Sequence, residues 1–227
     1  MNYLIVVAHP DDEVLGAGAS MWKWANNHNN KVYVCIMSSK AEERQKKPSD
    51  SELQNDIVRA SDVLNVKRIY NGSFKNLYFN NVPHVELVRF IEECIIDCQP
   101  DVIITHHPGD TNNDHLHTSL ACQAAGKLFQ RRPDIKPIKE FLFMEVLSST
   151  DWCINGSLTK FNPNYFVQVG EEAVNKKIES LSQYVGVMRD YPHSRSAESI
   201  KALATYRGSQ SNCLYAESFE MVFKREE

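Results

Sequence analysis

The sequence predicts an α/β protein with a Rossmann-like three-layer fold, in which a mainly parallel sheet is flanked by helices. Two observations favour this class. Apolar runs with the length of a strand alternate with longer stretches of helical pattern, which is typical of a parallel sheet covered by helices. Two of the apolar runs also end abruptly in clusters of His and Asp, at the kind of strand end where open α/β sheets bind ligands.

The elements follow one another in a regular order up to residue 147. Each expected strand is an apolar run, and a segment of helical periodicity leads from each run to the next. Strands are expected near residues 2–8, 31–38, 66–70, 101–106 and 139–147, and helices near 14–28, 50–64, 84–98 and 115–130.

The rest of the chain is less regular. Residues 148–170 are expected to form a cleft wall and to end in a short strand, and two C-terminal helices follow near 171–187 and 196–206. The polar segment Ser39–Ser51 is a candidate lid at the carboxyl edge of the sheet, and a solvated loop without function explains it equally well. We expect a single domain over residues 1–227, because a chain of this length buries a sizeable core.

The first strand ends at the segment HPDDE, residues 9–13. A buried strand has no structural use for an imidazole and three carboxylates at its end, because close carboxylates repel one another unless a cation neutralises them. His9 and Asp12 offer one nitrogen and one oxygen ligand, a mixture that suits zinc better than magnesium or calcium. A structural alternative is that Asp11 or Asp12 caps the helix that follows Glu13.

A second polar cluster, HHPGDTNNDHLH at residues 106–117, follows an apolar run at 101–105. Both clusters lie at strand-to-helix junctions, so they face each other across one crevice if the two strands are neighbours. The third metal ligand is expected from this second cluster. Within it, Asp110 flanks a turn and is placed nearer to structure than to catalysis. A site role and an ordinary loop or helix-start role remain equally open for His107 and His117.

Three segments of the chain carry a resemblance to a known family. They are residues 8–13 (AHPDDE), residues 110–115 (DTNNDH), and residues 206–208 (YRG) followed by 216–219 (AESF). In this order they resemble the AHPDDE signature, the D-x-H-x-D-H motif and the RG…AE-x-F segment of the LmbE/PIG-L family of zinc-dependent N-deacetylases. Three motifs in family order, spread over most of the chain, are more specific than one motif alone.

The resemblance implies a hydrolase that removes the N-acetyl group from an N-acetylated amino sugar or its conjugate, releasing acetate and a free amine. His9, Asp12 and His115 match the family's zinc ligands, and we expect one zinc per chain, with other divalent metals able to substitute. Asp11 matches the family's general base, the carboxylate that takes a proton from the attacking water. Asp114 is expected to orient a ligating histidine, as metal-bound imidazoles usually require.

The chain departs from the family pattern at Asn112. Many members carry a histidine there, which is thought to stabilise the oxyanion, whereas asparagine donates only a neutral hydrogen bond. We therefore expect Asn112 to keep the catalytic role in weaker form, or the role to pass to His106, His107 or His117 in the same loop.

Other classes of protein fit the sequence less well. A receiver-type phosphoacceptor domain also has an acidic pair after its first strand, but it needs an aspartate where this chain has His106 and His107. A dinucleotide site lacks the third glycine of G-x-G-x-x-G after residues 16–18, and no G-x-S-x-G marks a serine hydrolase. Two alternatives stay open: a metal-dependent amidase acting on a non-sugar N-acyl compound, and a non-catalytic metal-binding relative in which Asn112 reflects lost activity. Retention of Asp11 speaks against the second.

Composition and charge limit the classes of partner that the sequence indicates. The net charge of −4 gives no indication of nucleic acid or of an acidic membrane. No apolar run is long enough to span a bilayer, and no signal peptide is recognised, so we expect a cytoplasmic enzyme whose partner is a small-molecule N-acetyl sugar. The six cysteines lack C-x-x-C spacing and are expected to be buried free thiols. The sequence leaves open a homo-oligomer and the identity of the sugar and its carrier.

Overall fold

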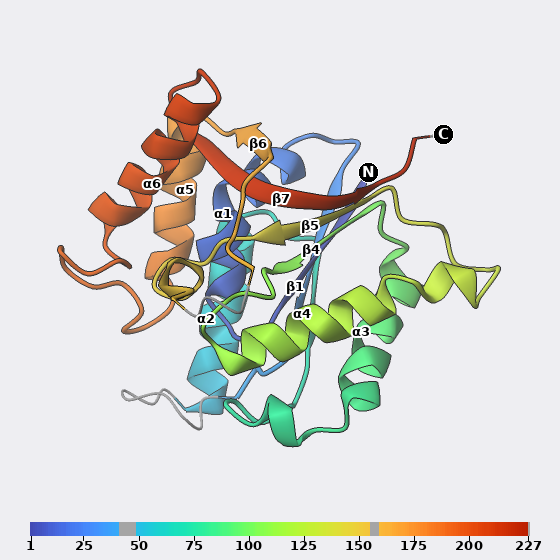
Figure 1. Cartoon of the computed structure of the whole chain (residues 1–227). Helices are drawn as coiled ribbons and strands as arrows, with labels where there is room; N and C mark the ends of the chain where they lie inside the picture. The colour runs from blue at the N-terminus through green and yellow to red at the C-terminus, as the bar shows by residue number, and fades with distance from the viewer. Residues whose placement is uncertain (41–48, 155–158, 227) are drawn as a thin grey trace.

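The computed structural model describes residues 1–40, 49–154 and 159–226. Within these ranges the chain forms a seven-stranded sheet of order β3-β2-β1-β4-β5-β7-β6, with helices on both faces (Figure 1). The α/β fold class expected from the sequence is confirmed. The strands are β1 (Asn2–Val7), β2 (Lys31–Ile36), β3 (Arg68–Asn71), β4 (Val102–His106), β5 (Glu140–Met144), β6 (Tyr165–Gln168) and β7 (Ala216–Lys224).

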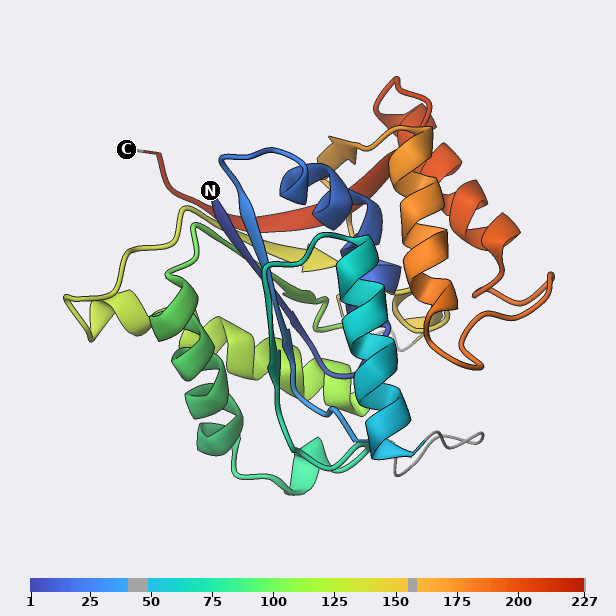
Figure 2. The ribbon, with the colours of Figure 1, turned by 180° about the vertical axis from the view of Figure 1, so that it is seen from behind.

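Two groups of helices cover the two faces of the sheet. α1, α2, α5 and α6 bury one apolar core against it, and α3 and α4 bury a second core on the other face. α5 packs against both α1 and α2, as the view from behind shows for α2 (Figure 2), and α3 packs against α4. The helices are α1 (Asp12–Ala25), α2 (Asp50–Val63), α3 (His84–Cys98), α4 (Asn113–Ala125), α5 (Glu171–Ser182) and α6 (Ala197–Gln210).

The central strand β1 is buried on both faces. Ile5 and Val7 belong to the first core, and Leu4 and Val6 belong to the second. Such a strand has an uninterrupted apolar sequence instead of an alternating one, which is why the first apolar run is easy to recognise. β1 pairs in parallel with β2 and β4, and β4 pairs in parallel with β5, so the carboxyl ends of these strands lie at one edge.

The side of the sheet that contains β7 and the edge strand β6 differs from the sequence-based expectation. The pattern does not predict β7, which pairs antiparallel with both β5 and β6. Two polar residues near its start, Glu217 and Ser218, are buried. Buried polar side chains hide the apolar pattern by which a strand is normally recognised. The sheet is therefore mainly parallel, with an antiparallel addition at one side.

Two further expectations concern loops and membranes. Residues 41–48 of the candidate lid and residues 155–158 of the expected cleft wall lie outside the described residues. No helix within the described ranges has both the length and the apolar character needed to cross a membrane.

Candidate active site

The two polar clusters meet at the carboxyl edge of the sheet. β1 and β4 are parallel neighbours with Val6 opposite Thr105, so the segments that follow them leave the sheet side by side. His9 lies in the turn after β1 and Asp12 begins α1, while His115 lies in the first turn of α4. The crevice expected between the two strand ends is therefore present.

Three side chains at this edge could hold a metal ion. Ligand atoms of His9, Asp12 and His115 all lie within 4.8 Å of one another. Asp12 Oδ2 is 3.3 Å from His9 Nδ1 and 3.1 Å from His115 Nε2. Two imidazole nitrogens and one carboxylate oxygen are a ligand set that zinc accepts, and three protein ligands leave a coordination position open. The donor chemistry therefore fits zinc.

The second nitrogen of each of these imidazoles faces another carboxylate. His9 Nε2 lies 3.0 Å from Asp114 Oδ2, and His115 Nδ1 lies 3.1 Å from Asp110 Oδ2. Asp114 is itself fixed by backbone N–H groups, because Leu77 and Phe79 donate to it over 2.6 and 3.1 Å. Carboxylates in this position set the tautomer and the orientation of a ligating histidine.

Asp110 joins the second cluster to the loop after β5. Its carboxylate accepts hydrogen bonds from the hydroxyls of Ser149 and Thr150 and from the backbone N–H of Asn112. Burial raises the pKa of Asp110, but hydrogen bonding to His115 outweighs this and brings the pKa to about 2. Asp110 thus connects His115, a candidate ligand, to the loop after β5, and together with His106 and His115 it forms a second group whose ligand atoms could hold a metal ion.

The electrostatics of the site favour a bound cation. Burial lowers the pKa of His115, but Asp12 and Asp110 overcome this and raise it to about 10. Burial likewise opposes protonation of His9, whose pKa Asp114 and Asp12 nevertheless raise. The pKa of Asp12 is held well below its usual value by His115 and His9 against the effect of burial. Carboxylates that draw protons onto buried imidazoles create a negative potential that a metal ion neutralises equally well.

Asp11 has a backbone conformation that is rare for a residue other than glycine. Its φ is 96°, in a region that costs on the order of 1–3 kcal/mol and persists only where its surroundings enforce it. Its N–H donates to Glu13 Oε2 over 3.1 Å, and Glu13 accepts a 2.6 Å hydrogen bond from the Tyr184 hydroxyl. The Asp11 side chain makes no capping hydrogen bond to α1. The structural alternative in which Asp11 caps this helix is therefore wrong.

These side chains open into a cleft of about 420 Å³. Sequence reasoning missed three of its residues, Asn76, Leu77 and Arg195, because none of them belongs to a recognisable local pattern. Arg195 Nη1 lies 3.4 Å from Asp11 Oδ2, and Asn76 Oδ1 is buried without a hydrogen-bond partner among the described residues. The cleft is lined by His9, Asp11, Asp12, Asn76, Leu77, Thr111, Asn112, His115, Ser148, Ser149 and Arg195.

None of the three histidines proposed to replace the family histidine is among these lining residues. His106 is fully buried, and its ring stacks on His115 with 3.8 Å between ring centroids. Burial lowers the pKa of His106 to about 3, so the ring is neutral. His107 Nε2 lies 3.4 Å from Glu220 Oε2, and His117 is half-buried on α4. The structure thus gives no support for passing the oxyanion role to any of the three.

Asn112 does line the cleft, and it also begins α4. Its Oδ1 accepts hydrogen bonds from the N–H groups of Asp114 and His115, over 2.9 and 3.4 Å. This N-cap fixes the turn that carries both residues. The side-chain oxygen is occupied by the helix, so the amide NH₂ is the part of Asn112 that can serve a ligand.

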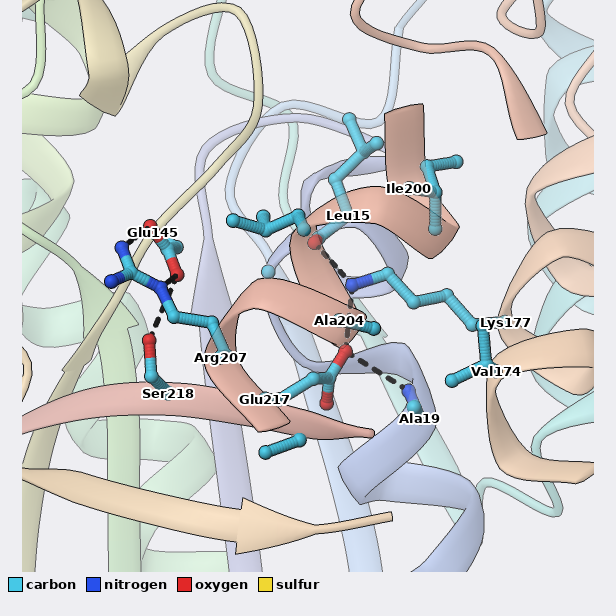
Figure 3. A pocket seen from close by; sticks show the side chains of 13 residues that line it. Leu15, Ala19, Glu145, Val174, Lys177, Ile200, Ala204, Arg207, Glu217 and Ser218 are labelled. Atoms are coloured by element: carbon cyan, nitrogen blue, oxygen red, sulfur yellow. Dashed lines mark hydrogen bonds and ion pairs between the residues drawn. The ribbon is translucent and has the colours of Figure 1, made fainter. Parts of the chain in front are cut away.

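The third motif, by contrast, contributes to an ion-pair network away from the cleft, which is partly exposed at Arg207 and buried at Glu217. Arg207 on α6 binds Glu145 through Nε and Nη2 over 2.8 and 2.6 Å, and the Ser218 hydroxyl donates to the same carboxylate (Figure 3). Lys177 on α5 lies 2.6 Å from Glu217 Oε1 and donates to the Leu15 carbonyl.

Glu217 also accepts hydrogen bonds from the backbone N–H groups of Ala19 and Ser20. The network therefore ties α1, α5, α6 and β7 together. Arg207 and Glu217, which carry the family resemblance near the C-terminus, belong to this network and do not line the cleft.

The chain is similar to a known protein family and to a curated relative. The family described as "PIG-L: GlcNAc-PI de-N-acetylase" matches residues 4–125, more than half of the chain. A curated relative, "Probable N-acetyl-alpha-D-glucosaminyl L-malate deacetylase 2" of Bacillus anthracis, is 23% identical over 132 residues. The match covers 55% of this chain and 58% of the relative, so it spans less than two thirds of that protein.

Solved structures also share the fold, and two of them are described here. GalB, the 4-carboxy-2-hydroxymuconate hydratase of Pseudomonas putida, superposes with a TM-score of 0.78 at 19% identity, covering 100% of this chain and 98% of that one. N,N'-diacetylchitobiose deacetylase of Pyrococcus horikoshii superposes with a TM-score of 0.77 at 16% identity, covering 97% and 83%. At these identities the likeness concerns the fold alone. A hydratase and a deacetylase share it, so the fold by itself does not decide the reaction.

Proposed function

The chain belongs to the PIG-L family, GlcNAc-PI de-N-acetylase, and from this premise we propose that it is a zinc-dependent hydrolase that removes the N-acetyl group from an N-acetylated amino sugar or its conjugate. The curated relative and the P. horikoshii protein are both named as deacetylases of N-acetylated sugars, which supports the substrate class. The observation that carries the proposal is the gathering of His9, Asp12 and His115 beside Asp11 in one cleft.

In this proposal His9, Asp12 and His115 hold one zinc ion. When bound, zinc supplies a Lewis acid for the acyl oxygen and makes water a stronger acid. Asp114 and Asp110 keep the two imidazole rings oriented through their second nitrogens. The chain's contribution to metal binding is thus a rigid set of donors, aligned before the ion arrives.

Asp11 is the proposed general base. It takes a proton from the attacking water and returns it to the nitrogen of the leaving amine, so that the products are acetate and a free amine. Its side chain is not used to cap α1 and lines the cleft instead. The neighbouring contacts of its N–H with Glu13 hold the strained backbone in place.

Asn112 is proposed to donate a hydrogen bond from its side-chain NH₂ to the oxygen that gains charge during the reaction. Its Oδ1 is bound to the first turn of α4, so the side chain is fixed in orientation. A fixed neutral donor stabilises a developing oxyanion without having to reorganise as the charge forms.

The test is release of acetate from a panel of N-acetylhexosamine conjugates and non-sugar N-acyl amines, with and without a chelator, followed by restoration with zinc. The proposal expects acetate from at least one sugar conjugate and its loss on chelation. Release only from non-sugar compounds would favour the amidase. Absence of release from any compound by the zinc-loaded protein would favour a different reaction or a non-catalytic relative.

A further inference from the structure

Two acids of the HPDDE segment, residues 9–13, are contacted by the same distant stretch of chain. Glu13 accepts a 2.6 Å hydrogen bond from the hydroxyl of Tyr184, which lies shortly after α5. The carboxylate of Asp11 is approached by Arg195, shortly before α6, with 3.4 Å between Nη1 and Oδ2. The irregular segment that joins α5 to α6 therefore supports both acids from outside the turn after β1.

The backbone of this segment is itself anchored. The N–H of Arg195 donates to Nδ1 of His193 over 3.0 Å, and the next residue, Ser196, is buried and caps α6. At the other end of the segment, the N–H of Val185 donates to Oδ2 of the buried Asp56 over 3.1 Å. The guanidinium of Arg195 is therefore presented to the cleft from a fixed point.

The contact of Arg195 with Asp11 differs from the ion pair of Arg207 with Glu145. Arg207 binds both carboxylate oxygens of Glu145 through Nε and Nη2. Arg195 approaches one oxygen of Asp11 through Nη1, and no residue in the described ranges accepts a hydrogen bond from its Nε–Nη2 edge. The distance exceeds the roughly 2.7–2.9 Å of charge-assisted hydrogen bonds, and contacts at active sites often shorten only when substrate binds. Arg195 can thus restrain this carboxylate without covering both of its oxygens.

The proposed role of Asp11 as base requires a carboxylate with a fixed orientation. A misplacement of about 1 Å in an active site can cost about 10²-fold in rate. Asp11 makes no side-chain capping hydrogen bond to α1, and its φ of 96° concerns the backbone and not the side chain. A cation placed at Oδ2 supplies a restraint on the side chain itself.

We propose that Arg195 is a positioning residue for the base, whose guanidinium holds the carboxylate of Asp11 in the orientation in which it takes up a proton. The inference rests on the proposed deacetylase function and adds a residue to it that acts through Asp11 and not through the substrate. A lysine at position 195 keeps the positive charge but not the planar guanidinium, so it should retain part of the role, whereas glutamine should lose it.

The kinetic test uses an N-acetylhexosamine conjugate that the parent hydrolyses. Arg195→Gln should lower kcat about 10- to 100-fold, while KM and zinc content stay within a few-fold of the parent. Arg195→Lys should recover part of kcat. The control Arg189→Gln, in the same segment, should match the parent, because the exposed Arg189 side chain donates only to the Gly186 carbonyl. A raised KM with unchanged kcat in Arg195→Gln would mean that the guanidinium binds substrate, and the inference would be overturned.

A double variant tests whether Arg195 acts through Asp11. If it does, Arg195→Gln has little left to remove once the base is gone, so the double variant should be as active as Asp11→Asn alone within a few-fold. A loss of kcat in the double variant equal to the product of the two single losses would show that the residues act independently, which contradicts the inference.

Crystal structures separate this inference from the reaction itself. In the zinc-loaded parent and in Arg189→Gln, the Asp11 carboxylate should occupy one position, and in Arg195→Gln it should be displaced or divided between positions on an unchanged backbone. An identical Asp11 carboxylate in all three proteins overturns the inference even if acetate is released. If no conjugate releases acetate but the carboxylate moves in Arg195→Gln, the proposed reaction fails while the positioning contact stands.

Discussion

The cleft and the buried network around Lys177 place charges inside the same fold in two different ways. In the network each charge meets its opposite within the protein, Lys177 with Glu217 and Arg207 with Glu145, both at 2.6 Å. In the cleft, buried carboxylates converge on imidazoles that attract a cation, and Arg195 leaves one edge of its guanidinium without a partner in the described chain. Buried charge alone therefore does not identify a site. A site is indicated instead by polar groups that lack a partner and converge on a cleft.

The same contrast divides the HPDDE segment itself. Asp11 and Asp12 line the cleft, whereas Glu13 is not among its lining residues and accepts a hydrogen bond from Tyr184. Burial raises the pKa of Glu13 to about 8, despite the hydrogen bond from Tyr184. Three successive acids thus have three different proposed tasks: base, ligand and support.

Removal of a ligand should have the largest effect on the cleft. His115→Ala removes one of three proposed donors and the partner of Asp110, so we expect loss of bound zinc and of acetate release. His117→Ala, on the same helix but outside the cleft, is the control and should keep both. Elemental analysis of proteins purified without added metal measures the difference. Equal zinc in His115→Ala and the parent would remove His115 from the ligand set.

Substitution of the proposed base should separate chemistry from metal binding. Asp11→Asn should keep zinc and lose about 10²- to 10⁴-fold in kcat, the usual contribution of a general base. Asp12→Asn should instead weaken zinc binding, because it changes a ligand. Kinetics and metal content measured together distinguish the two variants. Full activity of Asp11→Asn across pH, or loss of its zinc, would contradict the assigned roles.

A substitution in the network should lower the free energy of unfolding and leave the catalytic groups in place. Lys177→Met leaves Glu217 buried without its cation, which typically costs about 3–5 kcal/mol in the free energy of unfolding. The neighbouring Lys176, exposed and paired with Glu179 at the surface, provides the control Lys176→Met, expected to cost at most about 1 kcal/mol. Urea denaturation measures both. An unchanged unfolding free energy in Lys177→Met would show that the network does not stabilise the fold.

The sequence predicts what is local and misses what depends on distant partners. The sequence predicts the positions of His9 and His115, because each lies in a polar cluster that follows an apolar run. The family motifs include the same two residues. β7 is missed because the partners that satisfy the buried Glu217 are distant along the chain: Lys177 is 40 residues away, and Ala19 and Ser20 are further still. Arg195 is missed for a similar reason, since its contact with Asp11 spans 184 residues.

The smallest expected effect concerns Asn112, where cleft and scaffold coincide. Asn112→His restores the residue typical of the family, so turnover should be preserved or raised if the loop geometry follows the family. Histidine is a poorer N-cap than asparagine, and loss of the hydrogen bonds to the first turn of α4 should cost about 1 kcal/mol of stability. Asn112→Ser keeps a capping oxygen but has no NH₂ group, so it should retain stability and lose turnover. Urea denaturation and initial rates of acetate release, measured on both variants, separate the capping role of the Asn112 oxygen from the donor role of its NH₂ group. A collapse of turnover in Asn112→His, with zinc content and folding intact, would instead mean that the pocket is adapted to asparagine and does not accept a histidine at this position.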